Sequence, residues 1–83
     1  MEYSEIYAFR IRYLCQKRGI TINKLATLSG LKQSTIDNII RGTSKNPKVR
    51  TLHRIASALG MTLSEFLDFT ELNEYSIEDE DDE

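Results

Sequence analysis

The amino-acid sequence predicts an all-α domain, a compact five-helix bundle with an acidic C-terminal tail. Three observations support this fold class. Apolar residues recur at the spacing of a helix face, glycines separate the periodic stretches, and no stretch alternates polar and apolar residues for long enough to indicate a strand. With 83 residues, 40% of them hydrophobic and 29% charged, the chain has the length and composition of one small globular domain.

The first two helices are defined by periodicity and by their ends. Apolar residues with helical spacing predict a first helix over about residues 4–18. Thr21 is suited to cap a second helix, because its hydroxyl accepts a hydrogen bond from an otherwise unpaired amide of the first turn. This helix is expected to end near Leu28 or Ser29, where Gly30 supplies the left-handed backbone that ends many helices.

Three further helices are expected after that turn. The third covers Gln33–Ile40, with isoleucines on one side and polar side chains on the other. A polar loop with a proline separates it from a fourth helix over residues 49–59. The fifth has the clearest local signal, because Thr62 followed by Glu65 forms a capping box. We expect this last helix to end near Phe69.

Charge is divided unequally along the chain. From Glu71 onward there are eight acidic residues and no basic one, whereas residues 1–70 carry eleven Lys and Arg against five acids. We therefore expect a basic domain over residues 1–70 and a flexible acidic tail over residues 71–83. The tail has three interpretations: a solvated end, a phosphate mimic that folds over a nucleic-acid-binding surface, or a segment that docks onto a basic partner.

Composition argues against several classes of site and location. Cys15 is the only cysteine and His53 the only histidine, so we expect neither a disulfide nor a zinc site. No paired carboxylates, nucleophile with a base or phosphate-cradling glycine loop is found, so we predict no enzyme, no cofactor and no metal. Short apolar runs and the lack of a secretory signal predict a cytoplasmic protein with no membrane partner.

The stretch from Ile22 to Arg41 has the pattern of two short helices joined by a glycine-containing turn. This pattern describes both a helical hairpin and a DNA-reading helix-turn-helix. The register of small and apolar residues favours the second. Ala26 allows the two helices to approach closely, Gly30 falls four residues later at the turn, and Ile36 supplies an apolar contact.

Residues 19–67 resemble the phage-repressor-like (XRE/Cro) helix-turn-helix family. The matching segments, in order, are Thr21-Ile22-Asn23-Lys24-Leu25-Ala26, Ser29-Gly30-Leu31, Ser34-Thr35-Ile36, Ile40-Arg41-Gly42, Asn46-Pro47, Thr51-Leu52, Ile55-Ala56-Ser57-Ala58-Leu59-Gly60-Met61 and Leu63-Ser64-Glu65-Phe66-Leu67. The resemblance implies a lambda-repressor-like DNA-binding fold whose third helix enters the major groove of double-stranded operator DNA. It further implies a homodimer that regulates transcription. Repression is favoured over activation, because steric exclusion requires only binding.

The resemblance also assigns residues to the interface. Base-reading positions fall on Lys32, Gln33, Ser34, Asp37 and Asn38. These types suit the task, because Gln pairs with adenine in a bidentate manner, Lys donates to guanine and Asp accepts from cytosine. Phosphate contacts are expected from the amides that open the second helix and from Arg10, Thr21, Arg41, Lys45 and Lys48. Arg50 and Arg54 are interpreted as ordinary solvated charges.

Three departures from the family pattern are visible. Ile22 stands where many members have a Gln that reaches the DNA backbone, and Lys32 stands where a Ser or Thr often caps the third helix. Cys15 and Ile40 occupy the positions of an Arg–Glu pair in many relatives. We infer that apolar packing replaces the buried ion pair as a unit.

Two alternatives stay open at the level of partners. A protein-binding module, such as an antitoxin or a small adaptor, is the alternative to a transcriptional regulator; no small-molecule effector is expected, since the chain leaves no room for a sensing domain. An apolar and aromatic set near both termini either packs as core or forms a dimer surface. Its members are Tyr3, Tyr7, Phe9, Tyr13, Phe66, Leu67, Phe69 and Leu72.

Overall fold

The computed structural model describes residues 1–79 of the chain. Its elements are α1 (Tyr3–Arg18), α2 (Ile22–Ser29), α3 (Gln33–Ile40), α4 (Val49–Ala58), α5 (Leu63–Leu67), α6 (Thr70–Asn73) and a 3-10 turn, η1 (Ile77–Asp79). No strand occurs among the described residues, which confirms the all-α fold class. The first four helices agree with the predicted ranges to within one residue at each end.

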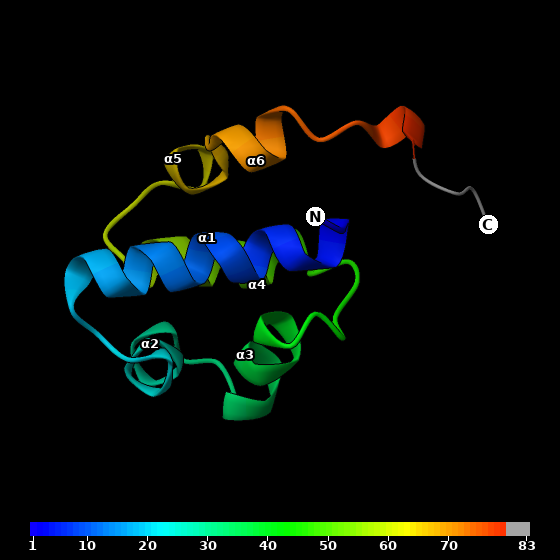
Figure 1. The fold of residues 1–83 in the computed structure, drawn as a ribbon. Helices are drawn as coiled ribbons and strands as arrows, with labels where there is room; N and C mark the ends of the chain where they lie inside the picture. Colours follow the sequence, from blue (N-terminus) through cyan, green and yellow to red (C-terminus); the bar gives the residue numbers. More distant parts are fainter. Residues whose placement is uncertain (80–83) are drawn as a thin grey trace.

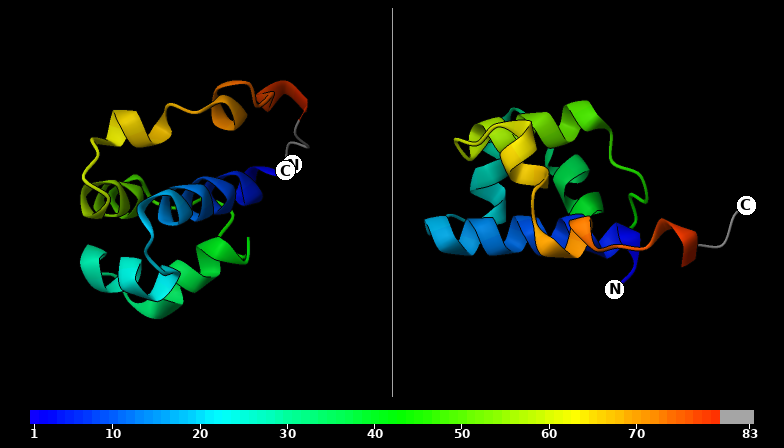
Figure 2. Two further views of the ribbon diagram at one scale, coloured as in Figure 1. Left: turned by 60° about the vertical axis from the view of Figure 1, so that its left-hand side comes forward. Right: turned by 90° about the horizontal axis from the view of Figure 1, so that it is seen from above.

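The helices are arranged in three levels around α1. In Figure 1, α1 crosses the middle of the molecule, α2 and α3 lie on one side of it, and α5 and α6 lie on the other. Helix α4 lies beside α1 in the middle level, as both views of Figure 2 show, and the left view shows the same order of levels. The contacts agree, because α1 packs on α3, and α4 packs on both α2 and α5. Helix α3 and the C-terminal helices therefore face opposite sides of the molecule.

One apolar core joins α1 to α5. It consists of Tyr7, Ile11, Leu14, Cys15, Leu25, Ala26, Ile36, Ile39, Leu52, Ile55, Ala56, Leu59 and Phe66, all buried. Burying a large apolar side chain of this kind contributes about 1.5 to 3 kcal/mol to folding. Because Ile36 and Ile39 of α3 are part of this core, the opposite side of α3 is fixed toward solvent.

The predicted helix caps are present. The Thr21 hydroxyl oxygen accepts a hydrogen bond of 3.0 Å from the Lys24 amide at the start of α2. At the start of α5 the Glu65 amide donates to the Thr62 hydroxyl at 3.1 Å, and the Thr62 amide donates to the Glu65 carboxylate at 2.8 Å. Gly30 has φ of +70°, the left-handed conformation expected at the end of α2.

The C-terminal part differs from the prediction of a single fifth helix. Helix α5 ends at Leu67, and Phe69 has extended backbone before α6 begins. The extended residue directs its own ring into the protein, where it is buried. Leu72 packs against the core, and the ring of Tyr75 lies 5.1 Å from the ring of Tyr3. The packed domain thus continues beyond residue 70, while positions 80–83 of the predicted tail lie outside the described residues.

Cys15 is a buried core residue. Burial raises the pKa of its thiol, and the nearby positive charge of Arg18 opposes this effect in part. Ile40 is half-buried and packs against the same core, so both positions that replace the Arg–Glu pair have apolar surroundings. No helix among the described residues is long and apolar enough to span a bilayer.

Candidate nucleic-acid interface

The polar side of α3 is turned away from the protein. Four of the five predicted base-reading side chains are exposed, and Asp37 is half-buried. They share one side of α3 because Ile36 and Ile39 anchor the other side in the core, where they are 0% and 1% exposed. The structure therefore brings the predicted base-reading residues together on an outward face of α3. Figure 1 shows this helix on the side of the molecule opposite to α5 and α6.

Two of these side chains are linked to a cation one turn further along α3. The Gln33 side-chain amide nitrogen donates to Asp37 Oδ1 at 2.9 Å, and Arg41 Nη2 lies 3.9 Å from Asp37 Oδ2. Arg41 is exposed and Asp37 is only half-buried, so this ion pair adds little to stability. The hydrogen bond to Asp37 favours one orientation of the Gln33 amide and leaves its oxygen and second N–H available.

Lys32 occupies the N-cap position of α3 and makes no side-chain capping hydrogen bond there. The departure from a Ser or Thr cap is thus confirmed. The unpaired amides of a helix N-terminus carry partial positive charge, and the ammonium of Lys32 adds to it. The end of α3 that precedes the base-reading residues is positive from two sources.

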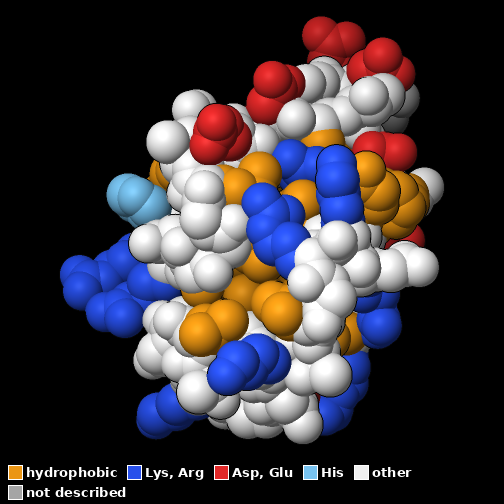
Figure 3. Space-filling model, turned by 90° about the vertical axis from the view of Figure 1, so that its left-hand side faces the viewer, with side chains coloured by type: hydrophobic (Ala, Val, Ile, Leu, Met, Phe, Trp, Pro, Cys, Tyr) orange, Lys and Arg blue, Asp and Glu red, His pale blue; other side chains and the backbone are white. Residues whose placement is uncertain are grey.

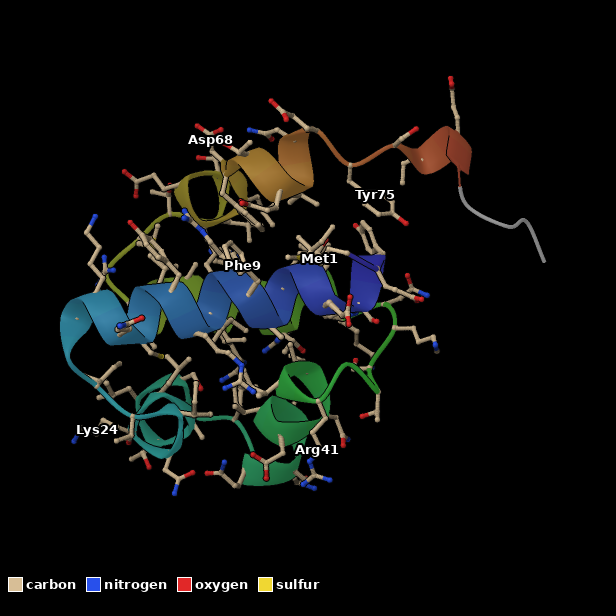
Figure 4. All side chains as sticks on the ribbon, viewed as in Figure 1. Met1, Phe9, Lys24, Arg41, Asp68 and Tyr75 are labelled. Atoms are coloured by element: carbon tan, nitrogen blue, oxygen red, sulfur yellow. The ribbon has the colours of Figure 1, made fainter. Side chains whose placement is uncertain are left out.

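The predicted phosphate ligands lie in two places, at the start of α2 and after α3, and Arg10 lies apart from both. Thr21 opens α2, and its hydroxyl proton remains available to a ligand because the oxygen is the acceptor in the cap. Arg41, Lys45 and Lys48 are exposed at the end of α3 and along the loop to α4. Figure 4 labels Arg41 on the same edge as Lys24 of α2.

Arg10 lies on the other side of α1 and is engaged with α5. Its Nε donates to the carbonyl of Phe66 at 2.9 Å, and its Nη2 donates to the carbonyl of Glu65 at 3.0 Å. The guanidinium also lies 4.8 Å from the centre of the Phe69 ring. Arg10 therefore satisfies carbonyls at the end of α5, and the structure does not bring it to the other predicted phosphate ligands. Nothing in the local sequence indicates this contact over more than fifty residues.

Basic and acidic side chains occupy different parts of the surface. Residues 38–54 contain five Lys and Arg, one histidine and no acid, whereas residues 55–83 contain ten acids and no Lys or Arg. Figure 3 shows the acidic side chains gathered at the top of the molecule and the basic ones from its middle to its base. The side of the molecule that carries α3 is consequently the one with positive potential.

A basic group on α4 was not among the predicted ligands. Arg50, His53, Arg54 and Ser57 line an open depression of about 410 Å³ on this helix. Their spacing of three and four residues places them on one face, and this spacing is visible in the sequence. Taken singly, Arg50 and Arg54 are ordinary solvated charges, and only their common face distinguishes them.

The sequence profile of the Cro/C1-type HTH DNA-binding domain matches residues 10–71 of the chain. Among curated proteins of Bacillus subtilis (strain 168), the SPbeta prophage-derived HTH-type transcriptional regulator YopS is 34% identical over 65 residues, 78% of this chain and 88% of YopS. The HTH-type transcriptional regulator SlrR is 36% identical over 58 residues, 70% of this chain but 38% of SlrR. The HTH-type transcriptional repressor RghR is 36% identical over 55 residues, 66% of this chain and 41% of RghR.

Two solved structures share the fold. The prophage Lp1 protein 11 superimposes with a TM-score of 0.80 and 34% identity, covering 90% of this chain and 100% of that protein. An HTH_3 family transcriptional regulator from Vibrio cholerae gives a TM-score of 0.69 and 31% identity, covering 78% of this chain and 36% of the other. The similarity therefore spans the helices that form the interface described above.

Proposed function

This chain belongs to the Cro/C1-type HTH DNA-binding domain family, and from that premise we propose that it represses transcription by placing α3 in the major groove of operator DNA. The family is a DNA-binding domain and not an enzyme. One observation carries the proposal: the polar side of α3 projects from the protein between positively charged residues while its apolar side is fixed in the core. A helix presented in this way fits the major groove, which is about 12 Å wide.

The proposed mechanism is non-covalent and has two parts. Basic residues attract the duplex and contact its phosphates, which positions the domain without selecting a sequence. We assign these contacts to Thr21, Arg41, Lys45 and Lys48, and leave Arg10 out because its guanidinium is engaged with α5. Base edges are then tested by the outward side chains of α3, each good pair contributing about 1 to 3 kcal/mol of discrimination.

Gln33 is the central base reader in this proposal. It is exposed in the first turn of α3, and the hydrogen bond to Asp37 restricts its amide before DNA arrives. Restricting a side chain in advance reduces the entropy lost when it binds. An adenine at the matching position would receive one N–H and donate to the Gln33 oxygen.

We further propose a homodimer. Most of the aromatic and apolar set near the termini packs within the chain, but Phe9 and Tyr13 on α1 are 42% and 48% exposed. A two-fold pair formed through these residues would present two copies of α3 to half-sites about 34 Å apart. Sedimentation of a Phe9→Ser, Tyr13→Ser variant tests this surface, because an unchanged dimer would place the interface elsewhere.

The proposed function is tested by anisotropy titrations of native promoter DNA at several salt concentrations. A regulator of this kind loses affinity steeply as salt rises, since each phosphate contact adds about 0.9 to the slope of log K against log salt. Occupied operators are then expected to reduce transcription in a purified system by steric exclusion. A protein-binding module, such as an antitoxin, would show no salt-dependent DNA binding, and that result would overturn the proposal.

A further inference from the structure

Helix α4 presents a basic face that the proposed phosphate contacts do not use. This α4 face is defined here as Arg50, His53, Arg54 and Ser57. All four residues are exposed, and they line a depression of about 410 Å³ that is open to solvent. The face therefore offers two guanidinium groups, an imidazole and a hydroxyl to one ligand.

Through Arg54, the α4 face reaches the turn that precedes α3. A Cβ added at Gly30 would lie 3.5 Å from Nη1 of Arg54, so the guanidinium rests against the turn between α2 and α3. Gly30 precedes the first residue of α3, Gln33, by only three positions. Arg54 therefore lies toward the N-terminal end of the proposed base-reading helix, whereas Lys45 of the α3–α4 loop follows its C-terminal end.

No carboxylate neutralises this face within the described part of the chain. The one ion pair found there joins Arg41 to Asp37 of α3. No acidic residue occurs in the sequence between Asp37 and Glu65, a stretch that contains all of α4. Two arginines held on one face without an acidic partner are suited to an anion, and their planar fork matches the oxygens of a phosphate.

We infer that the α4 face binds a backbone phosphate of the DNA duplex beside the N-terminal end of α3. The inference rests on the proposed DNA binding and adds a second positioning contact to it. A phosphate of a polymer fits better than a free anion, because the depression is open and a small anion would remain largely hydrated there. A duplex supplies a continuous row of phosphates that both this face and the α3–α4 loop contact at once.

The test compares two variants that lose the same charge. Arg50→Gln with Arg54→Gln removes two cations from the α4 face, and Arg12→Gln with Lys17→Gln removes two exposed cations from α1. Salt titrations use the full chain with a selected operator duplex and a random duplex. We expect the α4 variant to lose about tenfold in affinity for both duplexes and about 1 to 2 in salt slope. The α1 variant should stay close to the unmodified protein.

Ethylation of single phosphates locates the contact. Ethylation at one backbone position should lower the DNA affinity of the unmodified protein and of the α1 variant. The α4 variant should bind the ethylated duplex as well as it binds the duplex without ethylation. Thermal unfolding confirms that both variants fold. Should the α4 variant unfold, Ser57→Glu serves instead, since it places a carboxylate on the face without removing an arginine and should also weaken both duplexes.

Two outcomes overturn the inference. Equal salt slopes and ethylation patterns for the α4 and α1 variants would show that the face does not contact the duplex. Binding of inorganic phosphate to the α4 face at micromolar concentration, with DNA affinity unchanged in the α4 variant, would make it a free-anion site. Failure of the unmodified protein to bind any duplex would instead reject the proposed function, so the two failures are distinguishable.

Discussion

We propose a second role for Asp37, a predicted base reader, from its two side-chain partners. The sequence places it among residues that contact bases, where a carboxylate would accept from cytosine. In the folded protein its two oxygens face the Gln33 amide and the Arg41 guanidinium. We interpret Asp37 as a positioning residue that orients a reader and partly neutralises a phosphate ligand.

Asp37→Ala should therefore raise affinity for random DNA and reduce discrimination. Removing the carboxylate frees Arg41 and withdraws a negative charge from the phosphates, which should strengthen random binding several-fold at low salt. The operator should gain less, because Gln33 loses its orientation. Anisotropy on both duplexes measures the two effects. A lower operator affinity with no change on random DNA would make Asp37 a direct base reader.

Arg10→Met should destabilise the fold without weakening DNA binding. The substitution keeps the apolar stem but removes the two hydrogen bonds to the Phe66 and Glu65 carbonyls, at a cost of about 1 to 3 kcal/mol in the free energy of unfolding. Urea denaturation measures this, with the exposed Arg12→Met as the control. Unchanged stability together with lower DNA affinity would restore Arg10 as a phosphate ligand.

At the scale of elements, local signals define the first four helices well and the C-terminal end poorly. Glycine, Thr21 and the capping box act within a few residues of the backbone they affect, so they are visible in sequence. The break between α5 and α6 has another origin. Phe69 adopts extended backbone and is buried, with its ring under the guanidinium of Arg10. Such a contact depends on the tertiary fold, and no local pattern predicts it.

The same distinction applies to the interface. The outward side of α3 follows from helical periodicity, because isoleucines on one side fix polar residues on the other. Gln33 and Asp37 are four residues apart on a helix, and this spacing is sufficient to predict their hydrogen bond from the sequence. The position of Arg54 against Gly30 cannot be predicted in this way, since it depends on how α4 packs on α2.

A capping residue at the N-terminus of α3 should raise the stability of the protein and lower its DNA affinity. Lys32→Ser introduces a side chain that caps the first turn, which should add about 0.5 to 1 kcal/mol to the free energy of unfolding. The same change removes a cation beside the groove, so DNA affinity should fall several-fold with a smaller salt slope. Urea denaturation and anisotropy report the two quantities. A rise in both would show that Lys32 does not contact DNA.

The whole molecule is electrically polarised. Glu71, Glu74 and Glu78 follow α5, and the chain carries them on the side of α1 opposite to α3, as Figure 1 shows for α6 and η1. Of the three interpretations of the acidic segment, this placement supports a solvated end over a phosphate mimic that covers α3. These acids repel a duplex that approaches the side of α5 and α6, which favours its approach to the side of α3.

Deleting residues 76–83 should change DNA affinity only slightly. The deletion removes six acids but keeps Tyr75, whose ring lies against Tyr3. Because the remaining effect is long-range repulsion, affinity should rise a few-fold at low salt and not at 0.15 M, where charges are screened over about 8 Å. Titrations of both chains at the two salt concentrations measure this. A tenfold rise that persists at 0.15 M would support the phosphate mimic.

The central claim is that the polar side of α3 reads bases in the major groove. It is tested most directly by the ratio of operator affinity to random-duplex affinity for Gln33→Ala and the unmodified protein at one salt concentration. The account predicts that the ratio falls by about 5-fold to 150-fold, the equivalent of one lost base contact, while random-duplex affinity is unchanged. An unchanged ratio, whether neither affinity changes or both change by the same factor, would contradict it.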